Sequence, residues 1–130
     1  LSLARAAIRD IRALRMEKQV VIQSFSPIIC LTALAEAPEI RTELLASKSA
    51  DHPDRWDKII GFGWDIDAAG FNVHHESLTE DFLQQVHGAG KTVAVWTVDD
   101  PAIMQRLAAW GVDAIITNKP DLALETVAQP

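Results

Sequence analysis

The feature of this sequence that most constrains its fold is the alternation of short apolar runs with segments of helical periodicity. The clearest apolar run, residues 92–98, shows no alternation of polar and apolar side chains. Both faces of the predicted strand are therefore expected to be covered. Apolar residues at helical spacing precede this run at 77–88 and follow it at 100–110. A covered strand between two helices is typical of parallel βα units.

The same alternation of strands and helices is predicted over the whole chain. Pro27 suits the first turn of a helix, and the end of the 77–88 helix is marked by Gly88 and Gly90. Either Ser77 or Thr79 is expected to cap that helix. Strands are predicted at 20–22, 40–45 (a helical turn being the alternative), 71–73, 92–98 and 114–116. Further helices are predicted at 1–16, 27–37 and 55–69 and from 121 onward, with a polar loop at 47–54.

This order of elements predicts an α/β fold with parallel strands. Two architectures fit it, an open doubly wound sheet and part of a (βα)8 barrel. No strand is followed by a glycine-rich phosphate turn, which argues against a dinucleotide-binding sheet. A complete barrel needs roughly 250 residues, whereas this chain has 130. We therefore expect residues 1–130 to form a single partial TIM-barrel domain.

Composition excludes several classes of function. The net charge is −6 and no basic run is present, which argues against a nucleic-acid-binding surface. No apolar run approaches the ~20 residues that span a bilayer, and no signal peptide is visible, so a cytoplasmic location is predicted. The only cysteine, Cys30, lies in an apolar run and is expected to be a small buried hydrophobe.

In α/β barrels, chemistry lies where strands end and the following loops begin. Four such exits can be read in the sequence. They are Ser24-Phe25-Ser26-Pro27, His74-His75-Glu76, Trp96-Thr97-Val98-Asp99 and Thr117-Asn118-Lys119-Pro120. Neighbouring side chains of an extended chain point to opposite faces, so the two histidines do not predict a shared metal site.

Two further side chains at these exits have open roles. Asp99 is either the N-cap of the helix that follows it or a substrate contact. Lys119 is either a phosphate ligand or a solvated loop residue.

Several of these motifs resemble one family. The runs Val95-Trp96-Thr97-Val98-Asp99 and 111–120, GVDAIITNKP, are similar to two motifs of bacterial glycerophosphodiester phosphodiesterases. Ser24-Phe25, and Leu78-Thr79 leading into 86–91, VHGAGK, resemble two weaker motifs of the same family. The resemblance covers the chain from about Val20 onward and implies roughly strands 4 to 8 of a barrel. Asp99 stands where the family usually has Asn, and Asn118 where it usually has Asp.

The resemblance also implies an activity. A member of this family would hydrolyse glycerophosphodiesters to glycerol 3-phosphate and an alcohol, with a divalent metal, Mg²⁺ or Ca²⁺, and acid/base histidines. The metal-binding and acid/base motifs of the family are not found in this sequence. The chain alone is therefore expected to be inactive, with no catalytic residue or metal ligand of its own. Phe25 and Trp96 are the expected substrate-binding residues, and Trp96 as barrel core is the alternative.

A second class of function stays open. Half a barrel leaves two strand edges and one face without partners. The chain could therefore be a non-catalytic half-barrel that acts as an assembly or binding module. Its expected partners are a missing N-terminal half or a second copy of the chain, besides the glycerophosphodiester substrate. A different barrel hydrolase with the same pattern of strand exits is a third possibility.

Overall fold

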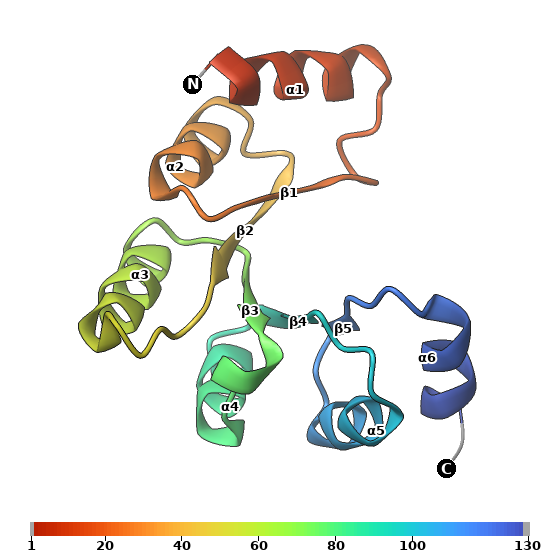
Figure 1. The fold of residues 1–130 in the computed structure, drawn as a ribbon. Coiled ribbons are helices and arrows are strands. Elements are labelled where there is room, and N and C mark those ends of the chain that lie inside the picture. The colour runs from red at the N-terminus through yellow and green to blue at the C-terminus, as the bar shows by residue number, and fades with distance from the viewer. Residues whose placement is uncertain (1, 129–130) are drawn as a thin grey trace. The chain divides into compact units, whose positions relative to one another are not determined.

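The computed structural model describes residues 2–128 and confirms the α/β fold class. Five parallel strands alternate with helices along the chain (Figure 1), and the order of the strands in the sheet is their order in the sequence. The chain divides into two compact units, Leu1–Phe71 and Asn72–Pro130. That residues 1–130 form one single domain stays a prediction. Within residues 2–128, no helix combines the length and apolar character needed to cross a bilayer.

The first unit holds the first two strands and begins the third. Its elements are α1 (Ser2–Ala13), β1 (Val21–Ser24), α2 (Pro27–Glu36), β2 (Arg41–Ala46), α3 (Pro53–Asp65) and the start of β3 (Gly70–His74). Strands β1 and β2 pair in parallel, with Gln23 opposite Glu43. The Glu43 side chain is buried and accepts hydrogen bonds from Gln23 at 3.2 Å and from Arg41 at 3.0 Å. This buried carboxylate is therefore paired, as its burial requires.

Helix α2 shows how the local sequence sets an element. The Ser26 side chain accepts a hydrogen bond from the backbone of Ile29, and Pro27 occupies the first turn, where its missing N–H costs nothing. Cys30 of this helix is buried as predicted, and burial raises the pKa of its thiol. The helix packs through Ala33 against Ile8 of α1, in a small cluster that includes Ala37 and Ile40.

The second unit begins within β3. Its further elements are a 3₁₀ turn, η1 (His75–Ser77), then α4 (Glu80–Gly88), β4 (Thr92–Trp96), α5 (Pro101–Trp110), β5 (Ala114–Ile115) and α6 (Pro120–Val127). Strands β4 and β5 pair in parallel, with Ala94 opposite Ala114. Val93 and Val95 of β4 are fully buried, in agreement with a strand that is covered on both faces. Gly111 ends α5 in the left-handed conformation at φ 89°, which suits a residue without a Cβ.

The structure decides between the two caps proposed for α4 and corrects one helix. Thr79 is the N-cap, because its side chain accepts a hydrogen bond from Phe82, whereas Ser77 lies in η1. The helix predicted at 55–69 begins earlier, at Pro53, and ends earlier, at Asp65. Proline at the first position starts that helix inside the segment 47–54, for which the sequence predicts a loop.

Candidate functional site

Trp96 ends β4, and its contacts with residues of the same unit fix its orientation. Its indole Nε1 donates a hydrogen bond to the backbone carbonyl of Asn72 at 3.1 Å. The ring of His74 lies edge-on to the indole, with centroids 5.1 Å apart and an interplanar angle of 79°, an arrangement that aromatic pairs favour. The side chain is half-buried. Because its one polar group is engaged by the backbone, Trp96 can offer a ligand only an apolar face.

The two histidines at the end of β3 are placed differently from the sequence expectation. His75 belongs to η1, so the chain is no longer extended there, and the rings of His74 and His75 stack at 4.6 Å. His74 Nδ1 accepts a hydrogen bond from the backbone N–H of Glu76 at 3.3 Å. The neutral His74 ring therefore carries its proton on Nε2. Burial lowers the pKa of His75, and the neighbouring His74 lowers it further.

Asp99 joins the loop after β4 to the loop after β5. Its Oδ1 accepts hydrogen bonds from the Thr117 hydroxyl and from the backbone N–H of Asn118, both at 2.8 Å. Its Oδ2 accepts a third from the Asn118 side-chain amide at 3.0 Å. The pKa of Asp99 is lowered by these bonds, most strongly by the one from the Asn118 side chain. The two residues that depart from the family motif are therefore a hydrogen-bonded pair.

Asp99 is not the cap of the following helix. That role belongs to Asp100, whose side chain accepts hydrogen bonds from the backbone of Ala102 and Ile103 at 2.8 and 3.2 Å. The sequence could not separate two adjacent aspartates, because both precede Pro101 closely enough to cap. Asp99 is thus free to hold the two exits together.

The lowered pKa of Asp99 gives a prediction about acid stability. A carboxyl group with a folded pKa below its unfolded value, about 3.9, stabilises the fold above that value and loses this contribution as pH falls through the folded pKa. Asp99→Asn removes the titrating group. We expect the melting temperature of the wild type to fall more steeply than that of Asp99→Asn between about pH 5 and 2.

Circular-dichroism melts across this pH range measure the difference. The matched control is Glu125→Gln, which removes an exposed carboxylate from α6 of the same unit and is expected to follow the wild type. Parallel curves for the wild type and Asp99→Asn would contradict the assignment.

Phe25 lies in the first unit, directly after β1, whereas Trp96 belongs to the second unit. Its side chain is 55% exposed. It lines a hollow of about 260 Å³ together with Ala46, Ser47, Ser49, Arg55 and Ile59. The last five come from the end of β2, the loop after it and the start of α3. The four strand exits predicted from the sequence do not include the end of β2. The polar run that follows the predicted strand 40–45 could have identified this exit as well.

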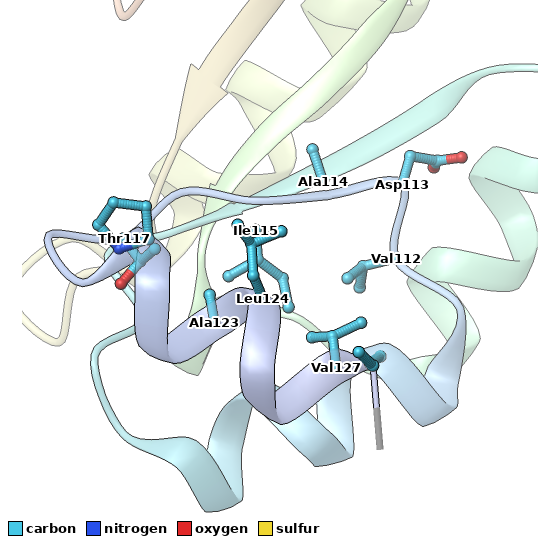
Figure 2. A pocket seen from close by; sticks show the side chains of 11 residues that line it. Val112, Asp113, Ala114, Ile115, Thr117, Ala123, Leu124 and Val127 are labelled. Atoms are coloured by element: carbon cyan, nitrogen blue, oxygen red, sulfur yellow. The ribbon is translucent and has the colours of Figure 1, made fainter. Parts of the chain in front are cut away.

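A larger, mostly apolar groove lies in the second unit beside β5. Its volume is about 610 Å³, and its lining side chains come from α5, β5 and α6 and the loops around them, of which Figure 2 labels those on β5 and α6 and nearby. Leu124 and Val127 of α6 are 72% and 48% exposed there. The Asp113 carboxylate is engaged elsewhere, because it accepts hydrogen bonds from Val93 N and His87 Nε2, each at 2.8 Å. The groove therefore offers apolar surface and little polar chemistry.

The described side chains form no cluster of the kind that holds a metal ion with three or more protein ligands. Across residues 2–128, no three His, Cys, Asp or Glu side chains gather in an arrangement that could hold one. At the end of β3, the His74 nitrogen that faces Glu76 already accepts a backbone hydrogen bond.

Comparison with known proteins places the chain. The model of the family described as "Glycerophosphoryl diester phosphodiesterase family" matches residues 3–122. The chain belongs to this family. The motifs that carried the resemblance in the sequence, from Ser24-Phe25 to the run 111–120, all lie within the matched residues.

The relatives of this chain reported below are longer than the chain itself. The glycerophosphodiester phosphodiesterase of Bacillus subtilis is 31% identical over 107 residues, which are 80% of this chain and 35% of that protein. A crystal structure from Silicibacter pomeroyi that carries the family name has a TM-score of 0.85 at 25% identity, over 95% of this chain and 42% of that one.

Two further crystal structures support the fold alone. A glycerophosphodiester phosphodiesterase from Parabacteroides distasonis has a TM-score of 0.80 at 22% identity, over 95% of this chain and 49% of that one. An Oleispira antarctica phosphodiesterase in complex with the product sn-glycerol-3-phosphate has a TM-score of 0.69 at 22% identity, over 82% and 41%. The chain thus spans less than half the length of these solved relatives.

Proposed function

We propose that this chain is the C-terminal, substrate-binding portion of a glycerophosphodiester phosphodiesterase. The family match over residues 3–122 carries the proposal. In the reaction, the oxygen of water bonds to phosphorus, the P–O bond to the alcohol breaks, and the alcohol leaves with a proton. The products are glycerol 3-phosphate and the free alcohol. The complex of the Oleispira antarctica relative with sn-glycerol-3-phosphate supports this choice of product.

The described side chains suit binding rather than bond breaking. Trp96 presents an apolar ring whose orientation is set by Asn72 and His74. Phe25 presents an exposed ring at the edge of a separate hollow. Both rings can pack against the carbon atoms of a glycerophosphodiester. We assign both to substrate binding, and no described residue to the chemical step.

Metal dependence belongs to the same proposal. Among residues 2–128, no three His, Cys, Asp or Glu side chains gather where they could hold a divalent ion. We infer that any Mg²⁺ or Ca²⁺ ligands of the complete enzyme lie outside residues 2–128, together with its acid/base residues. The chain alone is then expected to be inactive. Its cytoplasmic location stays a prediction.

The proposal is tested by supplying the part that the relatives have in addition. A chimera joins the N-terminal part of the Bacillus subtilis relative, up to the start of its match, to this chain. We expect the chimera to release glycerol 3-phosphate from glycerophosphocholine with Mg²⁺ or Ca²⁺, and to stop when chelator is added. The chain alone is expected to release none. Trp96→Ala in the chimera should lower kcat/KM by at least about tenfold, because it removes the apolar face.

Two outcomes would contradict the proposal. One is a folded chimera that is inactive while the intact relative is active under the same conditions. The other is turnover by the chain alone, which would mean that catalytic groups lie among residues 2–128. A thermal melt of the chimera establishes that it is folded.

The alternative function, a half-barrel assembly module, rests on a different observation. The groove beside β5 leaves large apolar side chains exposed, and such surface favours association. A second copy of the chain or an N-terminal segment of the same enzyme could cover it. Light scattering separates a dimer from a 14.3 kDa monomer. A stable monomer at high concentration would count against the assembly module and leave the enzyme proposal standing.

A further inference from the structure

The hollow beside Phe25 has the chemistry of a binding pocket. It measures about 260 Å³, and it lies where β1 and β2 end and α3 begins. Phe25 and Ile59 give it an apolar wall. Ser47, Ser49 and Arg55 line the same space, and their side chains carry hydrogen-bond donors. Apolar walls with a few converging polar groups are the usual composition of small-molecule sites.

The polar groups of this pocket are not used by the fold. Arg55 is exposed, and within residues 2–128 its guanidinium makes no hydrogen bond or ion pair; only its backbone N–H is engaged, with His52 O at 3.1 Å. The hydroxyls of Ser47 and Ser49 are likewise without a partner among the described side chains and backbone groups. Neighbouring Lys58, in contrast, pairs with Asp54 at 2.7 Å. The pocket therefore holds one cation and two hydroxyls that are available to a ligand.

The lining contains no carboxylate, and this restricts what can bind. A cationic group such as a quaternary ammonium would meet the Arg55 charge, with a single aromatic ring to favour it. Sites for quaternary ammonium groups are built instead from cages of several aromatic rings. Hydroxyl, carboxylate and phosphate oxygens, on the other hand, match a guanidinium and two hydroxyls.

We propose that this pocket receives the alcohol part of the substrate and selects alcohols that carry hydroxyl or anionic groups over choline. The inference rests on the proposed function, because it assigns the alcohol half of the proposed glycerophosphodiester substrate to this pocket. Arg55 donates to oxygens of the head group, Ser47 and Ser49 add shorter-range donors, and the Phe25 ring packs against the carbon chain. Glycerol and inositol are alcohols of the favoured class.

Binding to the purified chain tests the proposal without requiring turnover. NMR titrations with glycerophosphoglycerol, glycerophosphocholine and inorganic phosphate are followed at the Arg55 Nε–H and the Phe25 ring. We expect glycerophosphoglycerol to shift both signals and to bind at least about fivefold more tightly than glycerophosphocholine. Arg55→Gln should weaken glycerophosphoglycerol about tenfold, because it removes a charged donor. Arg55→Lys should restore only part of the affinity, since a single ammonium lacks the planar fork.

The matched control is Lys58→Gln, which removes the same charge from the same helix but not from the pocket. Its affinity is expected to stay within about twofold of the wild type, since charges away from the ligand are screened by salt. Arg55 is exposed, and a melt of each variant confirms that the fold is kept.

The inference would be overturned by equal affinity for the two diesters, by no effect of Arg55→Gln, or by no shift with any of the three compounds. If inorganic phosphate binds as tightly as glycerophosphoglycerol, the pocket recognises phosphate alone and the head-group assignment fails. The proposed function fails separately, through an inactive chimera. An active chimera with no Arg55 effect would keep the enzyme and discard the pocket.

Discussion

Gly63→Ala is expected to destabilise the first unit by about 1–2 kcal/mol, although alanine favours helices. Gly63 lies in α3, and a Cβ at this position would meet Phe71 Cε1 at 2.5 Å and Leu44 Cδ2 at 2.9 Å. Both side chains are fully buried, and Phe71 also packs on Trp64 with ring centroids 5.0 Å apart. Neither can give way without disturbing others. The overpacking cost, typically ~1–3 kcal/mol, therefore exceeds the gain of up to ~1 kcal/mol in helix propensity.

The same helix contains its own control. A Cβ added at Gly61 would meet no atom within 4 Å, and the backbone there has no positive φ. Gly61→Ala is therefore expected to stabilise by about 0.5–1 kcal/mol. Urea unfolding of the two variants measures both effects. If Gly63→Ala were as stable as Gly61→Ala, the close packing of α3 on β2 and Phe71 would be wrong.

Asn118→Asp is expected to lower the melting temperature of the second unit more than Asp99→Asn does. It places a second carboxylate against Asp99 and removes the donor that now bonds Asp99 Oδ2 at 3.0 Å. Like charges at hydrogen-bond distance repel, and two carboxylates cannot both stay ionised there without cost. In Asp99→Asn, by contrast, the amide oxygen can still accept from the Thr117 hydroxyl and the Asn118 backbone. The loss should therefore be largest for Asn118→Asp.

The double variant Asp99→Asn with Asn118→Asp restores one carboxylate and one amide, in exchanged positions. We expect it to recover most of the lost melting temperature, which a double-mutant cycle expresses as a favourable coupling between the two sites. Thermal melts near pH 7 of the wild type, both single variants and the double variant provide the cycle. Additive losses in the double variant would show that the two side chains do not depend on each other.

Much of the fold could be predicted because the sequence marks its elements locally. The apolar, β-branched run at 92–96 forms β4. Pro101 and Gly111 mark the two ends of α5. Alternatives stayed open where two residues carry the same local signal. Ser77 and Thr79 can both cap α4, and Asp99 and Asp100 both precede Pro101, so only the contacts in the folded chain distinguish them.

Less of the candidate site could be predicted, because it depends on residues that are distant in sequence. The hydrogen bond from the Trp96 indole to the Asn72 carbonyl joins two strands, and no local sequence pattern predicts it. The pocket beside Phe25 combines a strand exit with Arg55, thirty positions later in the sequence. Motif matching identified Phe25 and Trp96 as substrate-binding residues, and this assignment stays a prediction.

The indole N–H of Trp96 is already hydrogen-bonded to the Asn72 carbonyl. Trp96 can therefore strengthen ligand binding, but it contributes little to the discrimination between similar ligands. A ring that can offer only carbon gains free energy from any ligand of suitable shape, in proportion to the apolar area that it covers. Such a surface cannot strongly reject an analogue that differs by one hydroxyl group. In the proposed enzyme, Trp96 would therefore bind its part of the substrate permissively, and any choice among head groups would depend on other side chains that carry free donors. Exchanging those side chains between relatives would then redirect substrate preference while leaving the aromatic wall unchanged.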